Sequence, residues 1–144
     1  MVALLVALIA VLLLDQAVKL LVVRRSVHES ISLGSIGTVK RVPNQMWMAR
    51  SSHRLSPLAI WILWIVGACA LDALNTFLLV GGWFCGLLLG GSLSHAFEMT
   101  WRGYICDYVC LRFWPAFDLA DVAIAVGAIG IVTNLLSVAA NPVL

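Results

Sequence analysis

Charged residues are scarce in this sequence of 144 residues: they make up 11% of it, against about 25% in an ordinary soluble domain. Hydrophobic residues make up 62%, and the mean hydropathy is +1.04. So few charges cannot cover a water-facing surface, which excludes a soluble globular protein and indicates a bilayer as the solvent. The formal net charge is only +2 and forms no basic stripe, so nucleic acid is not an expected partner.

A cleavable leader and a zinc site of cysteines are also not indicated. The first apolar run has no basic residues before it and no small-x-small cleavage site before Arg24, so we interpret it as a retained anchor. Of the four cysteines, Cys69 and Cys85 fall in apolar runs and act as small apolar residues. Cys106 and Cys110 are too few for a structural zinc site.

Four apolar runs are long enough to cross a bilayer core about 30 Å thick, which takes about 20 helical residues. They cover residues 2–23, 55–71, 77–96 and 119–138. Only residues 72–76 separate the second run from the third, so these two form an antiparallel hairpin. The sequence therefore predicts one membrane domain over residues 1–144, an all-α bundle of four transmembrane helices.

Two long loops, 24–54 and 98–117, lie on the same side of the membrane because two spans separate them. The first alternates polar and apolar residues over 30–33 and continues through Gly34 and Gly37, which predicts a small β element after the first helix. The second carries aromatic residues that favour the headgroup layer: Trp101, Tyr104, Tyr108 and Trp114.

Loop charge alone favours a cytoplasmic position for both loops. Loop 24–54 holds six basic residues and one acidic residue, whereas loop 98–117 holds two of each. The positive-inside bias would therefore place the two loops in the cytoplasm.

Ionisable residues inside a span cost about 2.5 kcal/mol or more, so each one is a candidate site residue. Asp15 and Lys19 lie four positions apart on one face of the first helix, where they would neutralise each other. His95 and Glu98 lie three positions apart at the loop end of the third helix. These residues could either form structural pairs within the bundle or contact a substrate or ligand directly, and the sequence leaves both interpretations open.

Small residues recur every four positions in the third helix, at Gly82, Gly86, Gly90 and Ser94. Such a stripe lets another helix backbone approach closely, which predicts helix packing. The same face is also a possible docking surface for a partner membrane protein.

Three carboxylates lie at or near the start of the fourth helix: Asp107 in the loop, Asp118 at the helix entrance and Asp121 about one turn inside it. Asp118 is well placed to cap the helix N-terminus. Asp121 would be costly without a partner. Two carboxylates brought together can share one proton and activate water against a peptide bond.

These polar residues lie in three stretches of the sequence. They read Asp15-Gln16-Ala17-Val18-Lys19; Gly90-Gly91-Ser92-Leu93-Ser94-His95, then Glu98-Met99 and Arg102-Gly103-Tyr104-Ile105-Cys106-Asp107-Tyr108; and Trp114-Pro115-Ala116-Phe117-Asp118-Leu119-Ala120-Asp121. They resemble motifs of the lipoprotein signal peptidases (signal peptidase II): Asp-Gln-x-x-Lys; Gly-Gly-Ala-Leu-Gly-Asn with Asp-Arg and Arg-Gly-Tyr-Val-Val-Asp-Phe; and Trp-Pro-x-Phe-Asn-x-Ala-Asp. The resemblance covers all four spans.

The resemblance implies a four-span aspartyl peptidase of the bacterial inner membrane that needs no metal or other cofactor. Asp107 and Asp121 would be the catalytic pair, one taking a proton from water and the other protonating the leaving amine. The substrate would be a prolipoprotein, cut before a diacylglyceryl-modified cysteine among membrane lipids. The β element would be extracytoplasmic and both termini cytoplasmic, against the charge bias. The implied supporting residues are Asp15, Lys19, Asn44, His95, Glu98 and Asp118.

Four positions differ in chemistry from these motifs. His95 and Asp118 stand where the motifs have asparagine, and Glu98-Met99 stand where they have Asp-Arg. One histidine with several carboxylates is also the composition of a divalent iron or manganese site. The alternatives are therefore a metal-dependent membrane enzyme, with ligands drawn from His95, Glu98, Asp107, Asp118 and Asp121, and a non-catalytic partner or assembly subunit that docks through the glycine face.

Overall fold

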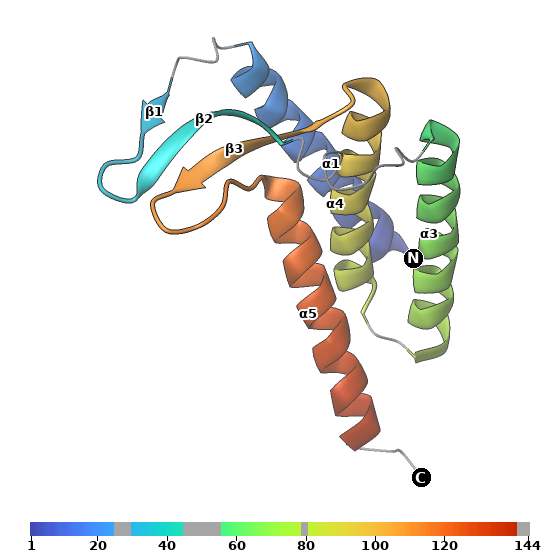
Figure 1. Cartoon of the computed structure of the whole chain (residues 1–144). Helices are drawn as coiled ribbons and strands as arrows, with labels where there is room; N and C mark the ends of the chain where they lie inside the picture. The colour runs from blue at the N-terminus through green and yellow to red at the C-terminus, as the bar shows by residue number, and fades with distance from the viewer. Residues whose placement is uncertain (25–29, 45–55, 79–80, 141–144) are drawn as a thin grey trace.

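The computed structural model describes residues 1–24, 30–44, 56–78 and 81–140. These residues form four long helices and a three-stranded sheet (Figure 1). In chain order the elements are α1 (Val2–Val23), β1 (Ile31–Ser32), β2 (Gly37–Asn44), α3 (Pro57–Leu78), α4 (Gly82–Trp101), β3 (Ile105–Leu111) and α5 (Leu119–Ala140).

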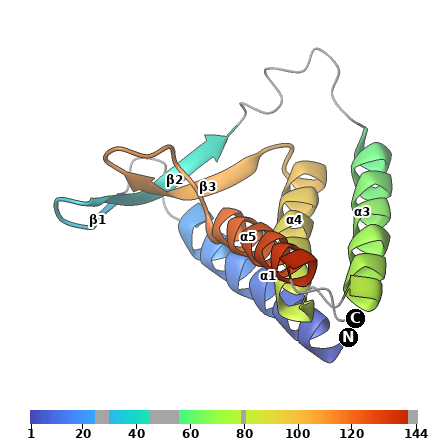
Figure 2. The same ribbon diagram turned by 90° about the horizontal axis from the view of Figure 1, so that it is seen from below.

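Helix α4 lies at the centre of the bundle and packs against α1, α3 and α5 (Figures 1 and 2). Helices α3 and α4 run antiparallel, as the short connection predicts. The connection is shorter than expected, because residues 72–76 belong to α3 and continue that helix to Leu78. The start of the expected span at residue 55 lies outside the described residues.

The small residues of α4 explain its central position. A Cβ atom added at Gly90 would lie 2.7 Å from the backbone oxygen of Leu8, and one at Gly91 would lie 2.5 Å from the backbone oxygen of Ala120. The helix backbones of α1 and α5 thus lie directly against α4, which confirms the predicted packing role. The stripe from Gly82 to Gly90 is covered by α1 of the same chain, so the prediction that it docks a separate protein is wrong.

Among the described residues, α1, α3 and α5 are long and apolar enough to cross a membrane. These helices correspond to three of the four expected spans. Helix α4 corresponds to the fourth, but glycine and polar residues such as His95 and Glu98 make it less apolar. Packing between the other helices fully buries Ser94 and Glu98, whereas the His95 side chain is 17% exposed.

The predicted β element is part of a larger sheet with strand order β1-β2-β3, antiparallel throughout. Gly34 has a φ of 71° in the turn between β1 and β2, a conformation that glycine adopts without strain. Strand β3 was not predicted, because the aromatic residues of the loop that contains it indicated only a position in the headgroup layer. Asn44 pairs with Ile105 and Val42 with Asp107, so β2 and β3 bring two candidate site residues together.

The close contact between α4 and α1 predicts a specific sensitivity to added volume. We expect Gly90→Ala to lower the melting temperature in detergent, because the new methyl group displaces the α1 backbone at a cost of about 1–3 kcal/mol. Gly67→Ala on α3 is the matched control, since a Cβ there meets nothing within 4 Å. Equal melting temperatures for the two variants would contradict the packing described.

Candidate active site

A buried lysine lies at the centre of the polar cluster. The Nζ atom of Lys19 lies 2.7 Å from Asp15 Oδ2, 2.6 Å from Glu98 Oε2 and 2.5 Å from Asp118 Oδ2. All four side chains are 0% exposed. An ammonium group has three N–H donors, and here each donor faces one carboxylate. Lys19 therefore joins α1, α4 and the start of α5, and the predicted pairing of Asp15 with Lys19 is confirmed.

The first two carboxylates have further partners. Ser94 Oγ donates to Asp15 Oδ2 over 2.5 Å and in turn accepts from Gln16 Nε2 over 2.7 Å. Arg102 Nη1 donates to Glu98 Oε1 over 2.6 Å, and the backbone N–H of Cys106 donates to Glu98 Oε2 over 3.3 Å. Ion pairs and neutral donors together compensate for removing Glu98 and Asp15 Oδ2 from solvent, whereas the buried Asp15 Oδ1 has no hydrogen-bond partner among the described residues.

Asp118 and Asp121 cap the N-terminus of α5 reciprocally. The backbone N–H of Asp121 donates to Asp118 Oδ1 over 2.8 Å, and the backbone N–H of Asp118 donates to Asp121 Oδ2 over 3.2 Å. This arrangement satisfies helix N–H groups that would otherwise lack partners, and it confirms the predicted capping role of Asp118. It also fixes the Asp121 carboxylate at the first turn of the helix.

His95 lies beside this cap. Its Nε2 atom is 3.3 Å and 3.2 Å from the two carboxylate oxygens of Asp118, and 3.7 Å from Asp121 Oδ1. Although burial raises the pKa of Asp118, the hydrogen bond from His95 and the charge of Lys19 outweigh it and lower that pKa to about 2. Asp118 is therefore ionised at neutral pH.

Asp107 belongs to β3 and is 2% exposed. Its Oδ2 atom accepts a hydrogen bond of 2.8 Å from Asn44 Nδ2. Burial raises the pKa of Asp107 from 3.8 to about 6, and the nearby carboxylates of Asp118 and Asp121 act in the same direction. The Asn44 amide opposes this shift without cancelling it. Asp107 thus titrates near the working range of a general acid.

The next residue on β3 connects this strand to the helix. Burial raises the pKa of Tyr108 to about 12, so its phenol stays neutral. The phenol oxygen accepts a hydrogen bond of 3.0 Å from the backbone N–H of Leu119. Strand β3 is thereby joined directly to the first residue of α5.

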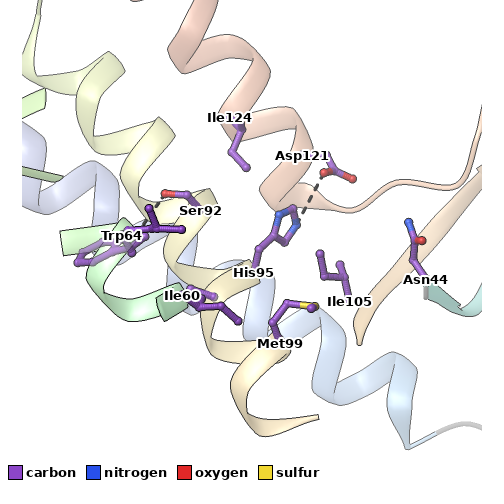
Figure 3. Close-up of a pocket in the computed structure, with 11 residues that line it drawn as sticks. Asn44, Ile60, Trp64, Ser92, His95, Met99, Ile105, Asp121 and Ile124 are labelled. Atoms are coloured by element: carbon purple, nitrogen blue, oxygen red, sulfur yellow. Dashed lines mark hydrogen bonds and ion pairs between the residues drawn. The ribbon is translucent and has the colours of Figure 1, made fainter. Parts of the chain in front are cut away.

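A cleft of about 590 Å³ opens beside His95 and Asp121 (Figure 3). Most of its lining is apolar and comes from α3, α4, β3 and α5. The residues are Asn44, Ile60, Leu63, Trp64, Ser92, His95, Ala96, Met99, Ile105, Asp121 and Ile124. The Asp121 side chain is 44% exposed, so its carboxylate is accessible whereas those of Asp107 and Asp118 are not.

The structure brings the predicted site residues together in two groups. Asp15, Lys19 and Glu98 form the buried network, in which Glu98 is turned toward Lys19 and Arg102. The second group lies around the cleft and the start of α5: Asn44, His95, Asp107, Asp118 and Asp121. Residues 45–55 of the first long loop lie outside the described residues.

Sequence analysis missed several supporting residues. Ser94 was interpreted only as a small packing residue, yet it hydrogen-bonds Asp15. Arg102 lies four positions after Glu98, a spacing that would have indicated their ion pair. Arg41 donates to the Tyr104 hydroxyl and lies over the Tyr104 ring. This contact joins two segments that are far apart in the sequence, so no local residue spacing predicts it.

Only part of the alternative metal-ligand set comes together within the described part of the chain. Ligand atoms of His95, Asp118 and Asp121 lie within 4.8 Å of one another. Asp118 already accepts from Lys19 at 2.5 Å, and Glu98 is occupied by Lys19 and Arg102. The geometry therefore favours a network of ion pairs and hydrogen bonds over a ligand shell.

The family model described as signal peptidase (SPase) II matches residues 7–137 of the chain. The chain belongs to the signal peptidase II family. Family membership and the apolar helices together make it a bacterial membrane protein. The resemblance in the sequence motifs is thereby confirmed.

Named relatives of the family match shorter segments. The chain is 34% identical over 89 residues to the lipoprotein signal peptidase of Syntrophomonas wolfei, covering 61% of this chain and 54% of that protein. It is 44% identical over 50 residues to that of Moorella thermoacetica, covering 35% of this chain and 33% of that protein. The matched segments thus span about half the length of the first relative and a third of the other.

Two solved structures have the same fold. Both are described as bacterial membrane enzymes studied by the in meso method. One has a TM-score of 0.77 at 20% identity and covers 95% of this chain and 89% of its own. The other has a TM-score of 0.74 at 19% identity and covers 91% and 90%. At these identities the likeness concerns the fold alone.

The buried lysine generates the first prediction from the site. We expect Lys19→Met to destabilise the chain by about 3–5 kcal/mol, because three buried carboxylates would lose their shared cation. The measurement is thermal unfolding in detergent at pH 7. Lys40→Met is the control, since Lys40 is exposed on β2 and should change stability by less than about 0.5 kcal/mol. A Lys19→Met variant as stable as the control would refute the central role of this network.

The raised pKa of Asp107 generates a prediction about stability and pH. A carboxyl whose pKa rises on folding contributes stability that is complete below its unfolded pKa of 3.8 and is lost as pH rises through about 6. Asp107→Asn removes the buried charge, so it should raise the melting temperature at pH 7.5 by about 2–5 °C more than at pH 4.5. Asp72→Asn on α3, away from the site, should show no such difference between the two pH values.

Proposed function

We propose that the chain is an aspartyl endopeptidase that removes the signal peptide from diacylglyceryl-modified prolipoproteins, with Asp107 and Asp121 as its catalytic pair. Two observations carry the proposal. Burial raises the pKa of the Asp107 carboxyl to about 6, and Asp121, whose charge acts on Asp107, presents an accessible carboxylate to an apolar cleft. Membership in the signal peptidase II family supports the same conclusion.

The chemistry follows from a pair of carboxyl groups that share one proton. The ionised carboxylate takes a proton from water as the water oxygen bonds to the scissile carbonyl carbon. The protonated carboxyl gives its proton to the leaving nitrogen as the carbon–nitrogen bond breaks. The proton taken from water then passes from the first carboxyl to the second, which restores the starting state. No cofactor is consumed.

The cleft supports a lipid-modified substrate. Its apolar lining from α3, α4 and α5 suits acyl chains, while His95, Asp121 and Asn44 mark its polar part. The Trp64 indole donates to Ser92 Oγ over 3.1 Å across α3 and α4, which fixes one wall (Figure 3). A diacylglyceryl group held here would place the peptide bond before the modified cysteine near the catalytic pair.

The same proposal includes a topology. All four helices cross the bacterial inner membrane, with α4 shielded from lipid by its neighbours. The sheet and the catalytic pair lie on the extracytoplasmic side, and both termini are cytoplasmic. Support comes from the antiparallel arrangement of α3 and α4 and from the position of the sheet at one end of the bundle (Figure 1).

The proposal is tested by cleavage of a diacylglyceryl-modified prolipoprotein by the purified chain in detergent, with and without EDTA. Asp107→Asn and Asp121→Asn should each slow cleavage at least about a hundredfold, because each removes a proton-transfer group. Asp72→Asn should stay within about twofold, and EDTA should have no effect. If the unmodified chain leaves the substrate uncut beside an active signal peptidase II control, the proposed function is wrong.

A further inference from the structure

We propose that His95, as a positively charged imidazolium, is a positioning residue that pairs with Asp118 and keeps Asp121 ionised. Asp121 is then the base that takes the proton from water, and Asp107 is the acid that protonates the leaving amine. This inference rests on the proposed function and assigns a role to each member of the pair.

The hydrogen bonds of Asp118 fix the proton on His95 Nε2. Asp118 Oδ2 already accepts from Lys19 Nζ at 2.5 Å, and Oδ1 accepts from the Asp121 backbone N–H at 2.8 Å. Asp118 is therefore an ionised acceptor with no proton to give. A bare Nε2 lone pair facing both oxygens at 3.2–3.3 Å would be repulsive, so Nε2 must be the donor.

Charge balance in the buried network requires the second ring proton as well. Among the residues that the structure describes, the three fully buried carboxylates, Asp15, Glu98 and Asp118, face two permanent cations, Lys19 and Arg102. An uncompensated charge buried at this depth is costly. A charged His95 makes the supporting network neutral and leaves the catalytic pair with the single negative charge that a shared proton requires.

The position of His95 makes the two proposed catalytic carboxyls unequal in their tendency to ionise. The ionisable groups that act on it are Lys19 from α1, Asp107 from β3, and Asp118 and Asp121 at the start of α5. Asp121 Oδ1 lies 3.7 Å from Nε2, so the cation favours its ionised form, and its side chain, at 44% exposed, is within reach of water. Asp107 is 2% exposed and has a raised pKa, so the shared proton resides there.

Two of the four differences from the family motifs, His95 and Asp118, compensate each other in charge. The motifs have asparagine at both positions, whereas this chain has His95 and Asp118, which contact each other. A neutral amide pair is thus replaced by a cation and an anion with no change in net charge. Reverting either residue alone unbalances the network by one charge, and reverting both restores the balance.

The kinetic test is a double-mutant cycle on cleavage of the modified prolipoprotein at pH 6.5. His95→Asn and Asp118→Asn should each lower kcat/KM about tenfold or more, and the double variant should regain activity to within about threefold of the unmodified chain. Lys40→Gln, exposed on β2, is the control and should leave kcat/KM unchanged. Additive losses in the double variant would overturn the inference, because a merely structural histidine would not be rescued.

Two spectroscopic measurements on the full chain in detergent do not depend on activity. In the nitrogen NMR spectrum of histidine-labelled chain, the His95 signal, assigned by its absence in His95→Asn, should show both ring nitrogens protonated at pH 7. In the infrared spectrum at pH 5, the band of a buried protonated carboxyl should disappear in Asp107→Asn and persist in Asp121→Asn. A neutral imidazole, or loss of the band only in Asp121→Asn, would overturn the inference.

The outcomes separate this inference from the proposed function. Absence of cleavage by the unmodified chain refutes the peptidase, while the NMR spectrum still decides the charge of His95. Cleavage that EDTA abolishes and Mn²⁺ restores would make His95 a metal ligand and overturn the inference. Cleavage with a neutral His95 would leave the peptidase standing and overturn the positioning role.

Discussion

The structure depends on one ammonium group that is removed from water. Burying the charge of Lys19 would be strongly destabilising without the three carboxylates that surround it. Burying those carboxylates would likewise be destabilising without Lys19. Since the partners come from α1, α4 and the cap of α5, the network fixes the relative heights of three helices. The same network ends at Asp118, whose other contacts are with His95 and Asp121. Bundle assembly and the arrangement of the proposed catalytic pair therefore share the same interactions.

Close backbone packing makes this network possible. Helix α4 carries a serine, a histidine and a glutamate through the middle of the bundle, where contact with lipid would be unfavourable. Its glycines allow α1 and α5 to lie directly against its backbone, and Ser94 and Glu98 are fully buried between the helices. In α4 the small residues thus allow the close packing that the buried polar side chains require.

The sequence was informative where a signal was local. Run length predicted the helices, the spacing of Asp15 and Lys19 predicted their pairing, and the position of Asp118 predicted a helix cap. It was uninformative where a contact joined distant segments. Glu98 faces Lys19, far away in the chain, although its local spacing suggested a place beside His95. Strand β3 was missed because its pairing with β2 joins two loops that are distant in the sequence. The aromatic residues of the second loop indicated an interfacial position instead.

The backbone between the two catalytic candidates forms a compact unit. After β3 the chain turns back, and Val109 and Phe117 exchange backbone hydrogen bonds of 2.9 Å and 3.0 Å. The Tyr108 phenol then accepts from Leu119 at the first turn of α5. Asp107 and Asp121 therefore belong to one short, contiguous hairpin that passes from strand to helix. The spacing of the two carboxyl groups is thus set within residues 107–121, so a substitution elsewhere in the bundle changes it only by deforming this segment.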